Sequence, residues 1–188
     1  MTVFLIAWAV SCSRGKDEAK SVEPPPAAAP ATPAASSSPK GEVAVATEGP
    51  AYGLRIEGAS LTYCDKRGAR KLDLASGQES AGSATCGAPE EANAACTGLA
   101  GLDVSVRAPG GDDIVDVEGQ SFPMRGKVQD CAALGKRVVV ASPGSILLID
   151  ADKGVSKDVA PGGADRVAMG GGWVVWTDGA KIRAAAAP

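Results

Sequence analysis

The stretch RVVVASPGSILLIDADKG, residues 137–154, decides the fold class. A β-branched run, Val138–Val140, is followed by the turn pair Pro143-Gly144 and by a second aliphatic run at 146–149. Short apolar runs bounded by Gly, Pro and Asp are typical of β-strands. The residues 150–154 supply another turn, so the stretch predicts two strands joined by a tight turn.

Weaker copies of this unit recur at residues 61–77, 102–119 and 173–183. Asp73, Asp116 and Asp150 take like positions at the end of the second strand of a unit. A period of roughly 35–45 residues made of short strands is typical of propeller blades, but closed propellers usually need more units. Residues 51–188 are therefore expected to form an all-β domain of short repeated hairpins, a small or partial β-propeller-like domain, with a twisted sheet or a sandwich as alternatives.

One unit also resembles a known family. The stretch DRVAMGGGWVVWTDGAKIR, residues 165–183, resembles a blade of the YWTD or quinoprotein-like propellers, since Val175-Trp176-Thr177-Asp178 matches that motif apart from its first residue. The resemblance implies the architecture only and carries over no functional residues. No cofactor is indicated.

The N-terminus contains the apolar run VFLIAWAV, residues 3–10. It is too short to cross a hydrocarbon core of about 30 Å, but it has the length of a signal-peptide core. The run ends in Ala9-Val10-Ser11-Cys12, which resembles a bacterial lipobox. This resemblance implies a signal peptide at 1–11 and acyl chains such as palmitate on Cys12, and Ser13 favours the outer membrane of the cell envelope.

Residues 12–50 differ in composition from the rest of the chain. A charged segment is followed by a stretch rich in Pro, Ala and Ser, and neither has a hydrophobic period. Such segments bury too little apolar surface to offset the entropy of ordering. We expect a lipid-anchored, disordered linker over 12–50, within which Val43 and Val45 fit a first strand.

The overall composition excludes several classes of function. The net charge is −3, whereas nucleic-acid binders usually present a basic face. Histidine is absent, which removes the commonest general base and zinc ligand. The acidic pairs Asp112-Asp113 and Asp150/Asp152 fit turn chemistry better than a calcium loop. No metal site, no nucleic acid and no catalytic residues are expected.

The remaining cysteines are expected to form disulfides if the domain is exported. They are Cys64, Cys86, Cys96 and Cys131. Three pairings are possible. The short loop between Cys86 and Cys96 favours their pairing, which leaves Cys64 with Cys131, and the spacing lacks the CxxC pattern of zinc or redox sites.

Two groups of side chains are candidates for contacts with other molecules. Trp173 and Trp176 are three residues apart, so in a strand they point to opposite faces; one is expected in the core and the other on a contact surface. A basic hairpin is expected to be a solvated face, with anionic lipid or an acidic protein as the alternative partner. It contains Lys66, Arg67, Arg70 and Lys71.

These features together predict a cell-envelope lipoprotein whose β-domain is a binding or scaffolding module. Its expected partners are the membrane, through lipid on Cys12, and an envelope protein or polysaccharide. One alternative is a hydrolase that uses two carboxylates in a cleft. Its candidate acids are Asp103, Asp112, Asp113 and Asp116. The other alternative is a purely structural envelope protein.

Overall fold

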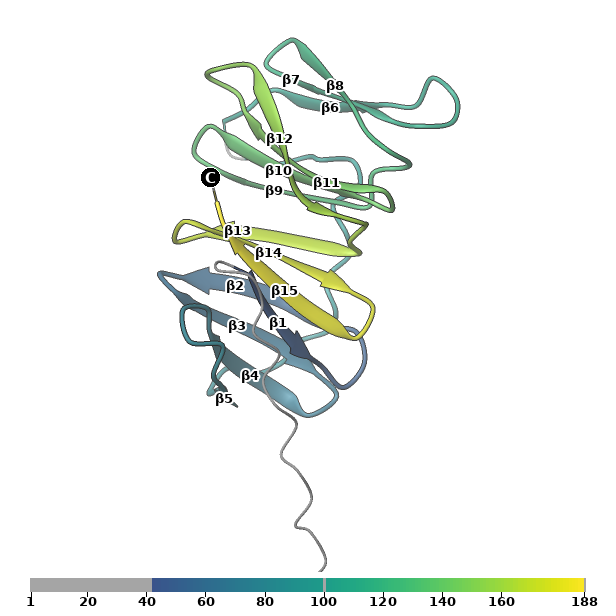
Figure 1. Ribbon diagram of the computed structural model, residues 1–188. Helices are drawn as coiled ribbons and strands as arrows, with labels where there is room; N and C mark the ends of the chain where they lie inside the picture. The colour runs from purple at the N-terminus through teal and green to yellow at the C-terminus, as the bar shows by residue number, and fades with distance from the viewer. Residues whose placement is uncertain (1–41, 100, 188) are drawn as a thin grey trace, which may run out of the picture. The chain divides into compact units, whose positions relative to one another are not determined.

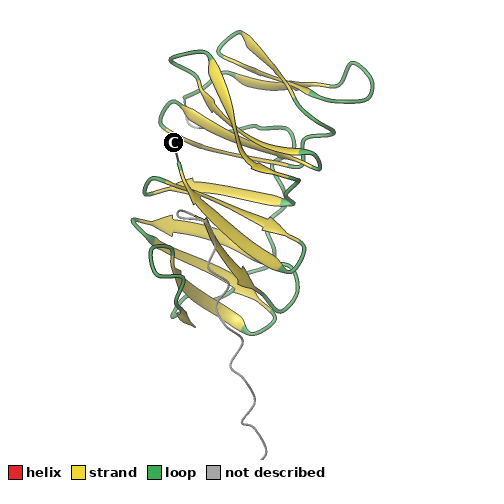
Figure 2. Ribbon diagram, viewed as in Figure 1, coloured by secondary structure: helices red, strands yellow, loops and turns green. Residues whose placement is uncertain are grey.

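The computed structural model describes residues 42–99 and 101–187, which belong to one compact unit. The predicted signal peptide, Cys12 and most of the predicted linker lie outside these residues. The described part contains strands and loops and no helix, as Figure 2 shows. It therefore contains no helix long and apolar enough to cross a membrane.

The described strands form four antiparallel sheets, which we name I to IV. Sheet I consists of β2 (Tyr52–Glu57), β3 (Ser60–Asp65), β4 (Gly68–Asp73) and β5 (Glu79–Ala81). Sheet II consists of β6 (Val104–Arg107), β7 (Ile114–Val117) and β8 (Gln120–Pro123). Sheet III consists of β9 (Asp130–Leu134), β10 (Arg137–Ser142), β11 (Ser145–Asp150) and β12 (Val155–Pro161). Sheet IV consists of β13 (Arg166–Gly170), β14 (Trp173–Asp178), β15 (Lys181–Ala186) and β1 (Glu42–Ala46).

The stretch 137–154 folds as its sequence predicts. Strands β10 and β11 pair in register from Arg137 opposite Asp150 to Ser142 opposite Ser145, around the turn at Pro143-Gly144. The hydroxyl of Ser142 accepts a hydrogen bond from the backbone N–H of Ser145 and so closes the turn. The expectation of an all-β domain of short hairpins with a partial propeller architecture is confirmed.

The folded unit begins earlier than residue 51, because β1 completes sheet IV from within the predicted linker. It pairs with β15 from Glu42 opposite Ala185 to Ala46 opposite Lys181. The expected first strand at Val43 and Val45 is thus confirmed, and both side chains pack against the core. The two ends of the described chain lie in one sheet.

Three apolar clusters hold the sheets together in the order I–IV–III–II, which Figure 1 shows. The cluster between sheets I and IV contains Leu61, Leu72 and Ile182. The cluster between sheets IV and III contains Val139, Leu148 and Trp176. The cluster between sheets III and II contains Val115, Phe122 and Val140. No apolar cluster of the described residues joins sheet I to sheet II, so this partial propeller does not close.

The amino-acid pattern explains why sheets III and IV lie inside the stack. Val138, Val139 and Val140 are all fully buried, and Val139 faces sheet IV while its two neighbours face sheet II. Sheets I and II instead alternate apolar with polar residues. A sheet with one apolar face can pack against only one neighbour. The polar faces therefore end the stack.

One expected correspondence between the repeats is wrong. In each sheet the residue after the third strand donates its backbone N–H to the carbonyl just before the second strand. These bonds run from Leu74 to Ala59, Met124 to Asp113, Ala151 to Lys136 and Ala187 to Gly172. Strands β7 and β8 thus correspond to β10 and β11. Asp116 lies in the second strand of its sheet, whereas Asp73 and Asp150 end third strands, and sheet II has no fourth strand among the described residues.

Candidate functional site

The segment 82–99, which we call the strap, follows sheet I and leads toward sheet II. It has no strand of its own among its described residues. Two disulfides attach it to the sheets. Cys86 bonds Cys64 of β3, with Cα atoms 5.9 Å apart, and Cys96 bonds Cys131 of β9, with Cα atoms 5.2 Å apart.

The favoured pairing of Cys86 with Cys96 and of Cys64 with Cys131 is therefore wrong. The strap carries Cys86 beside sheet I and Cys96 beside sheet III, and these two sheets are separated in the stack by sheet IV. Two cysteines that are close in sequence cannot form a disulfide when the chain places them beside different sheets. All four predicted cysteines are nevertheless bonded.

Two adjoining pockets lie beside the strap. The first has a volume of about 190 Å³ and is lined by Tyr52, Gly53, Leu54, Glu90, Glu91, Asn93, Asp130, Cys131, Arg166 and Val167. The second has a volume of about 260 Å³ and extends along sheet I past Arg55, Thr62 and Cys64. Because they share Tyr52, Gly53 and Glu90, we treat them as one site, the strap groove.

A β-bulge in β2 shapes the strap groove. Tyr52 lies opposite Cys64 and Arg55 opposite Thr62, so two residues of β2 face one residue of β3. Gly53, at this irregularity, has a φ of 63°, a conformation in which glycine carries no steric penalty. Bulges re-aim side chains and are frequent beside binding sites. Here the bulge places Tyr52 and Gly53 in both pockets.

A buried carboxylate holds the floor of the strap groove in place. Asp130 is 7% exposed and accepts hydrogen bonds from the backbone N–H of Asn93 at 2.7 Å and of Val167 at 2.9 Å. The Asn93 side chain in turn accepts from the backbone N–H of Thr97. One aspartate thus joins the strap, β9 and β13, three of the four elements that line the first pocket.

The charged groups of the groove have few protein partners. Half-buried Arg166 and exposed Arg55, Glu90 and Glu91 make no side-chain hydrogen bond or ion pair with the described residues. Charges of both signs beside a tyrosine ring suit a polar ligand that both donates and accepts hydrogen bonds. The described residues contain no group of three or more metal-ligating side chains.

The structure separates the two tryptophans as their spacing predicts. Trp176 is 2% exposed and belongs to the cluster between sheets III and IV, so it is the core residue of the pair. Trp173 is half-buried on the opposite face and packs partly against the cluster between sheets I and IV. Of the two contact-surface candidates, only Trp173 has accessible surface to offer.

The acids proposed for a hydrolase have separate structural roles, and none lines the strap groove. Buried Asp113 accepts hydrogen bonds from Lys127 Nζ and the Val128 N–H, both at 2.8 Å, and these lower its pKa. Arg107 and Ser121 donate to Asp116 and lower its pKa to about 2. Asp103 and Asp112 are exposed.

Two of the four cations of the predicted basic hairpin, Arg67 and Arg70, are paired with acids within sheet I, and Lys66 and Lys71 form no ion pair with the described residues. Arg67 pairs with Asp65 at 2.6 Å and with Glu79 at 2.7 Å. Arg70 pairs with Glu79 at 2.9 Å. Burial, with a hydrogen bond to Glu79, raises the pKa of Tyr63, so this cluster is a structural network of charges.

The sequence alone does not identify the residues that line the strap groove as a binding site. Gly53 carries the one usable signal, because a glycine inside an apolar strand pattern often marks a bulge. Arg166 and the glutamates of the strap belong to no pattern, since the segments that carry them meet only in the folded chain.

No protein-family profile and no curated protein matches the chain. Among solved structures, it is similar to the computationally designed Ika8 protein at 14% identity and a TM-score of 0.33, with 71% of this chain and 44% of that chain covered. It is also similar to the computationally designed Ika4 protein at 15% identity and a TM-score of 0.31, with 69% and 87% covered. The chain thus spans less than half the length of Ika8.

Proposed function

We propose that the chain is a cell-envelope lipoprotein, anchored through lipid on Cys12, whose β-domain is a non-catalytic binding module. The observation that carries the proposal is the pair of disulfides that attach the strap beside the groove. Disulfides persist mainly in oxidising compartments outside the cytoplasm. The lipobox-like Ala9-Val10-Ser11-Cys12 supports the same location.

The proposed binding site is the strap groove. Its bulge, its Tyr52 ring and its arginines lie on the strands β2 and β13, and its glutamates lie on the strap that the disulfides attach. Small sites with a few convergent polar groups are typical of ligand binding. The proposed ligand is a polar envelope component, either a segment of a protein or of a polysaccharide, and not a nucleic acid.

Intact-mass measurement of the chain extracted from envelope membranes tests the anchor. The expected mass corresponds to loss of residues 1–11, acyl chains on Cys12 and two disulfides. A mass that retains residues 1–11, or four free thiols in the β-domain, contradicts the proposal.

Site-specific photo-crosslinking in the intact envelope tests the groove. A photoreactive residue in place of Glu90 is expected to give an adduct of defined mass, and Arg166→Ala is expected to reduce its yield severalfold. The matched control is the same photoreactive residue in place of exposed Asp112, which lies outside the groove. Equal adducts from both positions, or none from Glu90, contradict binding at the groove.

A further inference from the structure

A third pocket, of about 190 Å³, lies on sheet III and shares no lining residue with the strap groove. We call it the sheet III pocket, and it is lined by Arg137, Leu148, Asp150, Lys153, Val155, Ser156 and Lys157. Lys153 pairs with Asp150 at 3.0 Å. Arg137 lies opposite Asp150 but forms no ion pair with the described residues, and neither does Lys157. The pocket is therefore cationic in a chain whose net charge is −3.

The strand register places the pocket beside exposed apolar surface. Leu134, Arg137, Asp150 and Val155 lie directly opposite one another across the sheet and share one face. Leu134 and Val155 are the exposed large hydrophobic residues of the described chain, at 51% and 54% exposure. In the next row on this face, Lys157 lies opposite Leu148, which is buried in the cluster between sheets III and IV.

The hairpin architecture does not require aliphatic and charged side chains at these row positions of sheet III. The corresponding row of sheet I is Glu57, Ser60 and Asp73, and that of sheet IV is Gly170, Trp173 and Ala186. The same backbone hydrogen bond closes the hairpin in all three sheets. Ser60 and Trp173 therefore satisfy the architecture at the position of Arg137, which in sheet III lies between exposed Leu134 and Asp150.

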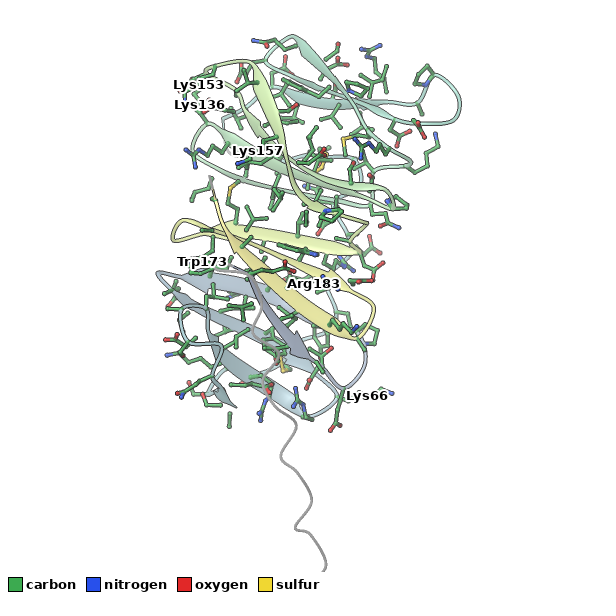
Figure 3. All side chains as sticks on the ribbon, viewed as in Figure 1. Lys66, Lys136, Lys153, Lys157, Trp173 and Arg183 are labelled. Carbon is green, nitrogen blue, oxygen red and sulfur yellow. A yellow bond between two sulfur atoms is a disulfide. The ribbon has the colours of Figure 1, made fainter. Side chains whose placement is uncertain are left out.

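The pocket lies at the strand end where the described chain begins. Glu42, the first described residue, pairs with Ala185, one residue from the row of sheet IV that corresponds to the pocket row. Figure 3 shows Lys136, Lys153, Lys157 and Trp173 on the same side, with Lys66 on the opposite side. A membrane anchor on Cys12 would keep the domain close to a bilayer, so the pocket would have anionic lipid within reach.

We propose that the sheet III pocket binds the phosphate headgroup of an anionic membrane lipid. Arg137 and Lys157 pair with the phosphate, while Leu134 and Val155 contact the apolar region just below it. Glu118, near Lys136 at 3.9 Å, and exposed Asp152 limit the cationic surface around the pocket, which favours one headgroup over a broad basic patch. The inference rests on the proposed lipid anchor, because that anchor supplies the membrane.

Vesicle co-sedimentation tests the proposal with residues 13–188, which keep all four sheets, so that neither the apolar run 3–10 nor lipid on Cys12 contributes. The chain is expected to bind vesicles that contain phosphatidylglycerol, to bind phosphatidylcholine vesicles weakly, and to be released by high salt or soluble glycerol phosphate. Since each basic residue near an anionic surface contributes about 1 kcal/mol, or about fivefold, Arg137→Gln with Lys157→Gln is expected to weaken binding by roughly 25-fold.

The control pair is Lys66→Gln with Lys181→Gln, which removes the same charge from two exposed positions at the other strand end. Equal loss in both pairs, or binding to glycerol phosphate without binding to vesicles, overturns the headgroup site. Val155→Ser is a second variant that keeps every charge, and it is expected to weaken vesicle binding without affecting glycerol phosphate. The mass of the wild-type chain reports separately whether Cys12 carries lipid, so the two proposals fail independently.

Discussion

Buried aspartates join the segments of this domain at the scale of single residues. Asp65 accepts from the Glu48 N–H, Asp113 from the Val128 N–H, and Asp130 from two N–H groups on the strap and β13. Hydrogen bonds to charged groups contribute more than neutral ones. The sequence predicted turn chemistry for Asp150, which accepts from the Lys153 N–H and confirms it, and also for Asp113, which instead bridges to Val128 fifteen residues away.

Asp130→Ala is expected to destabilise the domain by roughly 2–4 kcal/mol, because it leaves two buried N–H groups without their acceptor. Urea unfolding measures the change. The control is Asp112→Ala, at an exposed turn residue with no side-chain hydrogen bond to the described residues, which is expected to stay within about 0.5 kcal/mol of wild type. Similar losses of unfolding free energy in both variants would show that the Asp130 hydrogen bonds do not hold the strap and β13 together.

The domain is expected to lose stability in acid. The pKa of Asp116 is lowered to about 2 by Arg107 and Ser121, and that of Asp113 is lowered by Lys127. A lowered folded-state pKa stabilises the fold above the unfolded value of about 4, and this contribution is lost as the pH falls through the folded value. Thermal unfolding between about pH 5 and pH 2 measures the loss, which Asp116→Asn should reduce.

At the scale of elements, the hairpins could be predicted and their partners could not. Turn residues such as Pro143-Gly144 located the strand pairs, because the signal is local. The pairing of β1 with β15, the shift that moves Asp116 into a second strand, and the disulfide partners depend on segments distant in sequence. Closing such contacts costs entropy that no local pattern encodes.

Removal of either disulfide is expected to destabilise the domain by about 3–4 kcal/mol, since the loops closed are of similar length. The bonds span 22 and 35 residues. Denaturant unfolding of Cys64→Ala/Cys86→Ala and of Cys96→Ala/Cys131→Ala measures both. Proteolysis without reductant should link peptides containing Cys64 and Cys86, and a peptide pair joining Cys86 to Cys96 would contradict the structure.

At the scale of the whole molecule, the two faces of each sheet determine its place in the stack. Continuous apolar runs, as at Val138–Val140 and Trp173–Trp176, belong to the inner sheets. Alternating patterns belong to sheets I and II at the ends. This distinction can be read from the sequence. The order I–IV–III–II cannot, because it depends on β1, which precedes sheet I in the chain but pairs within sheet IV and so keeps these two sheets adjacent.

Adjacent residues of β4 provide a test of this stacking. Leu72→Ala removes a fully buried side chain from the cluster between sheets I and IV and is expected to cost about 2–5 kcal/mol. Lys71→Ala alters the exposed opposite face and is expected to change stability by less than about 0.5 kcal/mol. A large loss from Lys71→Ala would mean that another sheet covers that face.

The strand β1 also governs when the domain can form. Its residues 42–46 are synthesised early, yet they pair with residues 181–185 of β15. Sheet IV therefore stays incomplete until residues 181–185 have left the ribosome. Until then the backbone N–H and C=O groups of β1 have no partner strand, so folding of sheet IV cannot keep pace with synthesis.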